Sequence, residues 1–428
     1  MTLIGTFILI LFSVIVPFSL MTNKDIFSPA KIYLFYLLLF NLELVYVHYP
    51  LEHLLTFFIF LMIGILLVLV ESRANYLPKQ SFESGDNYYV ALKLTILVWL
   101  FSFFSLMAQV YLIIDAGGIY QYINDVVYKS TSWRGKGSFL MVISSIMVFQ
   151  IVYFAIGLYW NIKTKTWWLF FLVHLVLVLI IALLTGSRTV LLMNFIVMMI
   201  VYHYIRKPIS IYKSIGIVLI TIIIATVYGI ARNNLKISDG NLKTGLDESM
   251  PIDQKIRTMK STFHYGLLPL NFIYSYEPKK IQYGLGLVTP ITNVVPRNIW
   301  PSKPDTSSMA MNKEYIEDRG PGPYQYPAGI IGLGVMNFGW TFGITFGFLF
   351  IILSAYFINH IYTKNIKNNP LNNFQSVLNL IISLFIVLSF PAIIPGELTN
   401  VFHGLLLTKI APIVLIMIIY KQLRKKNA

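Results

Sequence analysis

Long apolar stretches separated by short polar segments run along almost the whole chain. Because backbone polar groups in lipid must be satisfied internally, such continuous runs predict α-helices rather than the alternating strands of a barrel. The expected fold is an all-α polytopic membrane protein with about 11 transmembrane helices, since about 20 apolar residues cross a bilayer. The eleven stretches are Leu3–Met21, Ile32–Val47, Leu54–Val70, Leu94–Ile114, Phe139–Trp160, Trp167–Leu184, Val190–Ile205, Ile215–Ala231, Val335–Ile358, Val377–Ile394 and Leu405–Tyr420.

One long segment interrupts this pattern. It divides the chain into residues 1–231 with eight predicted helices, residues 232–334 as a single large loop, and residues 335–428 with three helices and a basic tail. The loop is too rich in Tyr, Phe and Trp for a disordered linker, and loops of this length are usually functional. Its Pro296–Pro304 stretch predicts a rigid irregular ledge because prolines at that spacing break helices.

Composition excludes a soluble globular protein. Of the 428 residues, 57% are hydrophobic and 12% are charged, with a mean hydropathy of +0.70, whereas soluble domains are about 45–50% apolar. The chain has no cysteine, which excludes disulfides and thiolate chemistry. The net charge of +15 would suggest a nucleic-acid partner in a soluble protein. Here the cations lie mostly between apolar runs, so no nucleic-acid partner is expected.

The distribution of cations predicts the orientation. Sixteen of the 33 Lys and Arg residues lie in the C-terminal tail and in the loops on the same side as the tail, and five lie in the short loops of the opposite side. The other twelve lie in the long loop, and long translocated loops escape the positive-inside rule. The C-terminus is therefore expected in the cytoplasm, and the N-terminus and the long loop outside it.

Arginines at the external ends of helices are candidates for binding phosphate. Arg188 follows a Gly-Ser step between two apolar runs, Arg232 ends another run, and Arg257 and Arg297 lie in the loop. The planar guanidinium matches phosphate oxygens and stays charged at membrane depth, so the four predict a cradle for a diphosphate. The alternative for any single arginine is that it reaches to lipid headgroups.

Histidines and carboxylates on the same side are candidate general bases. His264 and His403 have aromatic neighbours, and Glu397 follows two prolines that end a predicted helix. An imidazole or a carboxyl with a shifted pKa can deprotonate a sugar hydroxyl. Each residue could equally be part of a hydrogen-bonded core. His174 is mid-span and expected to pack, whereas His203 is expected to be solvated; Glu43, Glu52 and Asp253 are competing carboxylates.

The chain lacks the sequence patterns of several common enzyme classes. It has no phosphate-binding loop, no His-Glu-x-x-His or Asp-x-Asp pair and no Gly-x-Ser-x-Gly. These absences argue against ATP hydrolysis, a dedicated metal site and a simple serine hydrolase. Neither a metal nor a cofactor is expected.

Three sequence pieces occur in an order that resembles a known family. Gly186-Ser187-Arg188, the Val295–Pro304 stretch and Met336-Asn337-Phe338-Gly339 are similar to the bacterial oligosaccharide repeat-unit polymerases, the Wzy-type O-antigen and capsular polymerases. The resemblance implies glycosyl transfer at the outer face of the bacterial plasma membrane, in a fold similar to GT-C glycosyltransferases and O-antigen ligases. Donor and acceptor would be undecaprenyl-diphosphate-linked oligosaccharides, and a separate chain-length regulator would be a partner.

The resemblance also assigns residues. Arg188, Arg232 and Arg297 would hold the diphosphate leaving group, while Trp300, Lys303 and Asn337 would support the loop or the substrate. One position departs from the family, because many members have a glutamate where this chain has Leu333. A lipid-linked glycan ligase would share all of these features. A flippase is the alternative that is not an enzyme, and it would be expected to show repeat symmetry or several charges deep in its helices.

Overall fold

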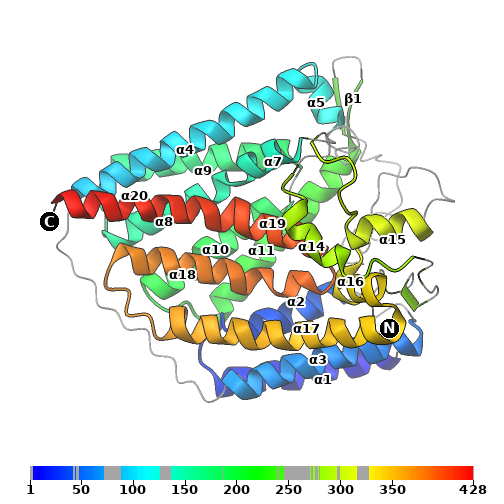
Figure 1. The fold of residues 1–428 in the computed structure, drawn as a ribbon. Helices are drawn as coiled ribbons and strands as arrows, with labels where there is room; N and C mark the ends of the chain where they lie inside the picture. The colour runs from blue at the N-terminus through cyan, green and yellow to red at the C-terminus, as the bar shows by residue number, and fades with distance from the viewer. Residues whose placement is uncertain are drawn as a thin grey trace. The chain divides into compact units, whose positions relative to one another are not determined.

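The computed structural model describes residues 3–41, 44, 48–71, 88–125, 136–186, 188–238, 241–244, 270, 273, 274, 278, 280–295, 299–315 and 327–427. Helices make up most of these residues (Figure 1). In the described part of the chain the strands are β1 (Leu235–Ser238) and β2 (Asn241–Thr244), which pair antiparallel with Leu235 opposite Thr244. The all-α prediction is therefore confirmed apart from this short hairpin.

Eight helical segments of the described residues are long and apolar enough to cross a membrane. Shorter apolar helices occupy Pro29–Phe40, Leu192–Ile205, Ile211–Thr221 and Gly329–Phe338. These lengths confirm a polytopic membrane protein, and the exact number of eleven spans stays a prediction. The eight segments are Gly5–Thr22, Leu51–Glu71, Tyr88–Asp115, Gly137–Tyr159, Lys165–Leu184, Trp340–Lys367, Phe374–Ile393 and Leu398–Lys425.

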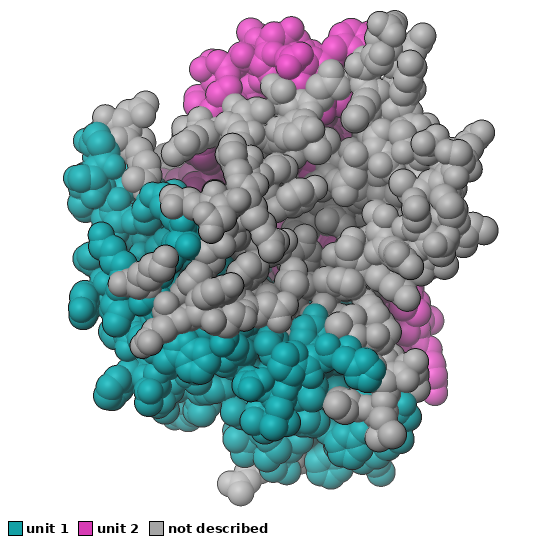
Figure 2. Space-filling view, turned by 90° about the vertical axis from the view of Figure 1, so that its right-hand side faces the viewer, with its two compact units in different colours: residues 1–77, 257–367, 385–405 teal, residues 78–256, 368–384, 406–428 magenta. Residues whose placement is uncertain are grey.

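Two compact units divide the chain. Unit 1 comprises residues Met1–Leu77, Arg257–Lys367 and Phe385–Leu405, drawn in teal in Figure 2. Within it α1, α3 and α17 run side by side (Figure 1). Its helices are α1 (Leu3–Thr22), α2 (Pro29–Phe40), α3 (Leu51–Glu71), α14 (Leu285–Thr292), α15 (Ser307–Tyr315), α16 (Gly329–Phe338), α17 (Trp340–Ile361), which continues as the π-helix η4 (Tyr362–Lys367), and α19 (Leu398–Leu405).

Unit 2 comprises residues Pro78–Ile256, Asn368–Leu384 and Leu406–Ala428. At its centre lies α8 (Ile146–Tyr159), which is buried almost throughout its length and packs against α4, α9 and α10. A helix that is apolar on every face is typical of the inside of a bundle. The other helices are α4 (Tyr88–Asp115), α5 (Ile119–Asp125), α7 (Gly137–Ser144), α9 (Lys165–Leu184), α10 (Arg188–Ile205), α11 (Ile211–Asn234), the π-helix η6 (Leu406–Ile410) and α20 (Ala411–Asn427), while α18 (Phe374–Ser389) runs from unit 2 into unit 1.

A tight helical hairpin in unit 1 corrects one sequence prediction. The expected continuous span Val335–Ile358 is broken at Gly339, whose φ of 74° lets the chain reverse between α16 and α17. A Cβ atom on Gly334 would collide with the backbone of Gly343, so the two helices touch through bare backbone. Small residues at a helix contact permit this close approach in membrane proteins.

Candidate functional site

Four short helices of unit 1 meet around the segment that follows α18. The helix α18 ends at Ser389 because Pro391 cannot continue its hydrogen-bond ladder, and a short 3-10 turn spans Pro391–Ile393. Glu397 then caps α19, with its carbonyl accepting the N–H of Val401 at 3.0 Å. We call the meeting of α14, α15, α16 and α19 the loop junction. It brings residues that are more than one hundred positions apart in sequence into contact.

Glu397 is the acidic group of the loop junction. Its side chain is only 7% exposed, and its Oε2 accepts the backbone N–H of Ser308 at 2.9 Å, in the first turn of α15. Burial raises the pKa of Glu397, and hydrogen bonds from Ser308 and Thr399 oppose that rise only in part. A raised pKa moves a carboxyl toward the range in which it can act as a general base near neutral pH.

His403 lies on a different face of α19. Its Nε2 is 2.5 Å from the carbonyl oxygen of Pro290 in α14. Because a carbonyl only accepts, Nε2 carries a proton and donates it to this bond. Four residues earlier, on the same face, the Thr399 hydroxyl is 2.6 Å from that of Thr289. Two hydrogen bonds therefore join α19 to α14.

Asn337 connects three of the four helices and is completely buried. Its Oδ1 accepts the N–H of Gly286 at 2.9 Å, and its Nδ2 donates to Ser307 Oγ at 3.1 Å and to the carbonyl of Leu333 at 2.7 Å. Both amide hydrogens are used, so the side chain is fixed. This geometry suits support of the loop, as the resemblance implied; a contact of Asn337 with substrate stays untested.

The structure describes residues 299–304 of the predicted Pro296–Pro304 ledge, which follows α14. Lys303 is buried, and its Nζ donates to the carbonyl of Val295 at 2.7 Å, just beyond the C-terminus of α14. A cation at this end of a helix is stabilised by the helix dipole. Trp300 is 39% exposed, and its carbonyl accepts the N–H of Lys303 at 3.3 Å. Lys303 thus holds the ledge against α14.

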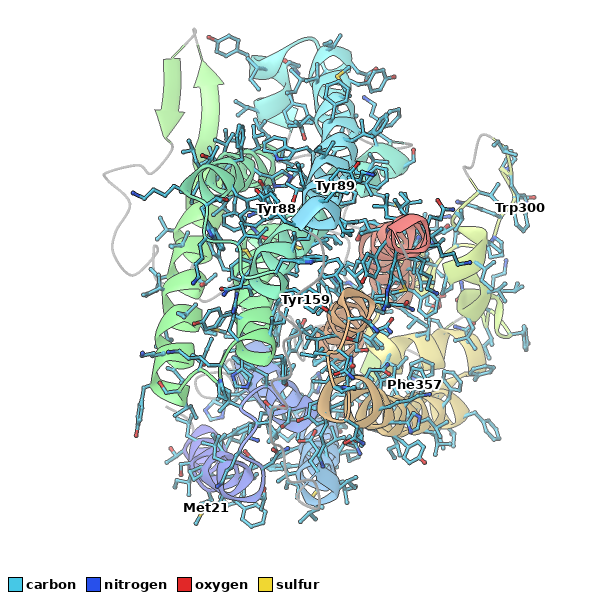
Figure 3. All side chains as sticks on the ribbon, turned by 90° about the vertical axis from the view of Figure 1, so that its left-hand side faces the viewer. Met21, Tyr88, Tyr89, Tyr159, Trp300 and Phe357 are labelled. Carbon is cyan, nitrogen blue, oxygen red and sulfur yellow. The ribbon has the colours of Figure 1, made fainter. Side chains whose placement is uncertain are left out.

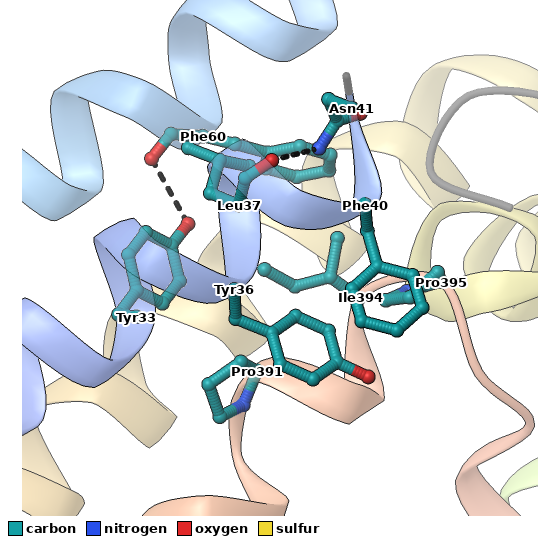
Figure 4. A pocket seen from close by; sticks show the side chains of 9 residues that line it. All are labelled: Tyr33, Tyr36, Leu37, Phe40, Asn41, Phe60, Pro391, Ile394 and Pro395. Carbon is teal, nitrogen blue, oxygen red and sulfur yellow. Dashed lines mark hydrogen bonds between the residues drawn. The ribbon is translucent and has the colours of Figure 1, made fainter. Parts of the chain in front are cut away.

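Aromatic side chains of α2 and α3 pack against the break that leads to Glu397 (Figure 4). The Tyr33 hydroxyl donates to the carbonyl of Phe60 at 2.9 Å, drawn as a dashed line in Figure 4. The Tyr33 ring also stacks on Phe390, with 5.6 Å between ring centroids. The pocket that remains is narrow and admits little more than a water molecule. We interpret it as packing that positions the break. Its lining residues are Tyr33, Tyr36, Leu37, Phe40, Asn41, Phe60, Pro391, Ile394 and Pro395.

The other predicted site residues lie wholly or partly outside the described residues. Arg188 begins α10 and Arg232 lies near the end of α11, so both occupy helix ends, but their side chains are not described. His264, Arg257 and Arg297 fall outside the described residues altogether. The diphosphate cradle therefore stays a prediction. In the described part of the chain, no three His, Asp or Glu side chains gather as metal ligands would.

Sequence reasoning missed the hydroxyl residues of the loop junction. Ser307 and Ser308 follow Thr306 at the start of α15, and such a run before a helix is a recognisable capping pattern. Thr289 gave no comparable signal, because it lies in an apolar stretch like many others. Its importance appears only through its contact with Thr399, 110 residues away.

Membrane-length apolar helices dominate the described residues, and the loop helices place a buried carboxyl and an imidazole beside a span. These features define a multi-pass membrane protein with a candidate reaction centre. The chain matches the family model of the O-antigen polysaccharide polymerase Wzy over residues 1–427, and it belongs to this family. No curated protein and no solved structure shows a match to it. The family membership confirms the resemblance found in the sequence and indicates a role in polysaccharide polymerisation.

Proposed function

We propose that this protein joins polyprenyl-diphosphate-linked oligosaccharide repeat units into a surface polysaccharide, without a metal, at the outer face of the bacterial plasma membrane. The observation that carries the proposal is the family match over residues 1–427. The loop junction supports it, because a buried carboxyl of raised pKa lies beside an apolar span, where a lipid-linked substrate arrives.

The reaction is a displacement at an anomeric carbon. A hydroxyl of the acceptor's terminal sugar attacks that carbon, the bond from the carbon to the diphosphate oxygen breaks, and the diphosphate leaves with its lipid. The hydroxyl proton passes to a base, for which we propose the Glu397 carboxylate. His403 and His264 are the alternatives.

Charge develops on the departing diphosphate. We propose that Arg188, Arg232, Arg257 and Arg297 hold it, because fixed cations that face developing charge lower the barrier. Trp300, Lys303 and Asn337 would keep the loop in place around the substrate, in keeping with the contacts of Lys303 and Asn337.

The test is an assay on purified protein in nanodiscs with a defined undecaprenyl-diphosphate repeat unit and a chelator, without nucleotide. The expected product is a ladder spaced by one repeat unit. Arg188→Ala, Arg232→Ala and Arg297→Ala should lose the ladder while membrane insertion is kept. Lys313→Ala is the matched control, because Lys313 lies in the same loop and pairs with Asp305 at the surface. Arg→Lys variants should recover little, since a point charge cannot make bidentate contacts.

Two results would overturn the proposal. Transfer of the glycan only to an acceptor that is not a repeat unit would identify a ligase. Transport of the intact lipid-linked unit across vesicles, with no ladder, would identify a flippase and make the arginines a headgroup-binding site.

A further inference from the structure

The helix α14 presents an apolar face that no other described part of the chain covers. Gly286 and Thr289 are buried against the loop junction. On the other side, Leu285 is 54% exposed, Val288 44% and Ile291 73%. The face continues into the ledge through Val294, Ile299 and Trp300, which are also exposed. We call these six residues the α14 apolar face. Exposed apolar patches of this kind mark sites of interaction.

The absence of charged residues around α14 favours lipid as the partner of this face. From residue 281 to residue 295 the chain contains no Asp, Glu, Lys or Arg. An eight-residue helix is about 12 Å long, whereas the hydrocarbon core of a bilayer is about 30 Å thick. This segment therefore cannot span the membrane. A short uncharged helix with one fully apolar face is suited to lie partly inserted among lipids.

Two hydrogen bonds fix the position of α14 along the apolar segment Leu398–Lys425. Its partners Thr399 and His403 belong to the first turns of the apolar segment Leu398–Lys425. The helix α14 is thus level with the end of a membrane-length helix. On that same helix Phe402 is 43% exposed, so apolar surface is present on both neighbours. Figure 3 shows Trp300 projecting away from the helices of unit 1, as an aromatic ring at a membrane interface does.

We propose that the α14 apolar face is inserted about 5–10 Å into the boundary between headgroups and acyl chains and contacts the lipid acyl chains. The exposed Lys280, just before α14, would then reach the lipid phosphates. Insertion anchors the carbonyl of Pro290, and through it the ring of His403. This inference depends on the chain being a multi-pass membrane protein and not on the reaction proposed for it.

The natural absence of cysteine permits a direct test. Single Ile291→Cys and Leu285→Cys variants would be labelled with an environment-sensitive fluorophore in nanodiscs that contain one copy of the protein. Both residues are more than half exposed, so a label at either position has room outside the protein. Lys313→Cys in α15 is the matched control, because its charged side chain is exposed and paired with Asp305. Gel filtration would verify that each variant is folded.

Insertion predicts that lipids brominated near the headgroup end of the acyl chain quench most of the fluorescence at positions 291 and 285. Aqueous iodide should quench the label at position 313 instead. Iodide quenching at position 291 as strong as at position 313 would overturn the proposal. The same labels would also be measured in nanodiscs that contain two copies of the protein. If the labels were shielded from both quenchers there and not in one-copy nanodiscs, the proposal would be overturned, and a second copy would be the occupant of the face.

Discussion

Both units bury histidines, and the surroundings of His174 in unit 2 differ from those of His403 in unit 1. In unit 2, Ser102 Oγ is 2.6 Å from Nε2 of His174, Gln150 bonds Nδ1, and Trp99 lies edge-on at 5.0 Å between ring centroids. All of these partners are neutral side chains on spanning helices. In unit 1, His403 bonds a backbone carbonyl of a loop helix, and a carboxyl lies six residues before it on the same segment.

The difference separates a histidine that joins spanning helices from one in the proposed reaction centre. His174 uses both ring nitrogens to join α4, α8 and α9, which is what polar side chains do between helices in lipid. The bond of His403 to Pro290 uses Nε2 only, and Glu397 adds a group that can gain or lose a proton close to the loop. A buried histidine alone thus does not indicate a site. Neighbouring groups with a shifted pKa and loop helices around them make the loop junction the stronger candidate for one.

The largest contrast in activity is expected between neutral substitutions of Glu397 in the loop junction and of His174 in unit 2. Glu397→Gln removes the proposed base and should lower the rate of chain synthesis by about 10²- to 10⁴-fold. His174→Gln should leave the rate per folded molecule within a few-fold, because that cluster only joins helices. The measurement is the ladder assay on equal amounts of folded protein. If Glu397→Gln keeps its activity while His403→Gln or His264→Gln loses it, the base is the histidine concerned.

The glycine contact of the α16–α17 hairpin offers a test of packing at the loop junction. Gly334→Ala places a methyl group against the backbone of Gly343, which cannot rotate away, and should cost about 3 kcal/mol of unfolding free energy. In unit 2, Gly216→Ala is the matched control, because nothing lies within 4 Å of a Cβ at that position in α11. It should be neutral or stabilising by up to about 1 kcal/mol. Thermal unfolding in nanodiscs would compare the two, and equal effects would contradict the hairpin geometry.

A hydrogen bond of the loop junction should contribute more to stability than a hydrogen bond of the His174 cluster in unit 2. Asn337→Ala leaves the buried N–H of Gly286 without its acceptor and should destabilise the chain by about 1–3 kcal/mol. Ser102→Ala removes one bond between spanning helices, for which about 0.6 kcal/mol is typical. Unfolding measured side by side would test the order. A larger loss of unfolding free energy in Ser102→Ala than in Asn337→Ala would contradict this order.

The membrane-length helices could be predicted because hydropathy alone specifies them, whereas the loop helices α14 and α15 and the break at Gly339 could not. The apolar pattern runs through it without interruption, and only the positive φ of this glycine reverses the chain. His203 was predicted to be solvated, and this was wrong. It is buried at the end of α10, where its Nδ1 accepts the N–H of Ile209 at 3.0 Å. Both errors arise where the chain turns, since turns depend on backbone geometry and not on hydropathy.

Part of the candidate site could also be predicted. Pro391 and Pro395 indicated that Glu397 would lie at a broken helix end, and the structure confirms that position. Its partner Ser308 lies 89 residues away, and the contact of His403 with Pro290 spans 113 residues. No local pattern encodes such contacts, because they depend on how the loop helices fold back onto the spans.

The smallest expected effect is a pH dependence of stability, to which Glu397 of the loop junction should contribute. Burial raises the pKa of Glu397 above 4.5 in the folded chain, so the folded state holds this proton more tightly than the unfolded state. Its contribution to stability is complete below pH 4.5 and is lost as the pH rises through the folded pKa, at no more than about 1.4 kcal/mol per pH unit. Activity should change in the opposite direction, because a base must be deprotonated. Glu397→Gln should make the stability profile less steep over this window, whereas His174→Gln should keep the slope that Glu397 causes. If the slope in Glu397→Gln equals that of the unchanged protein over this window, another group causes it, and the assignment of a titrating carboxyl to the loop junction would be wrong.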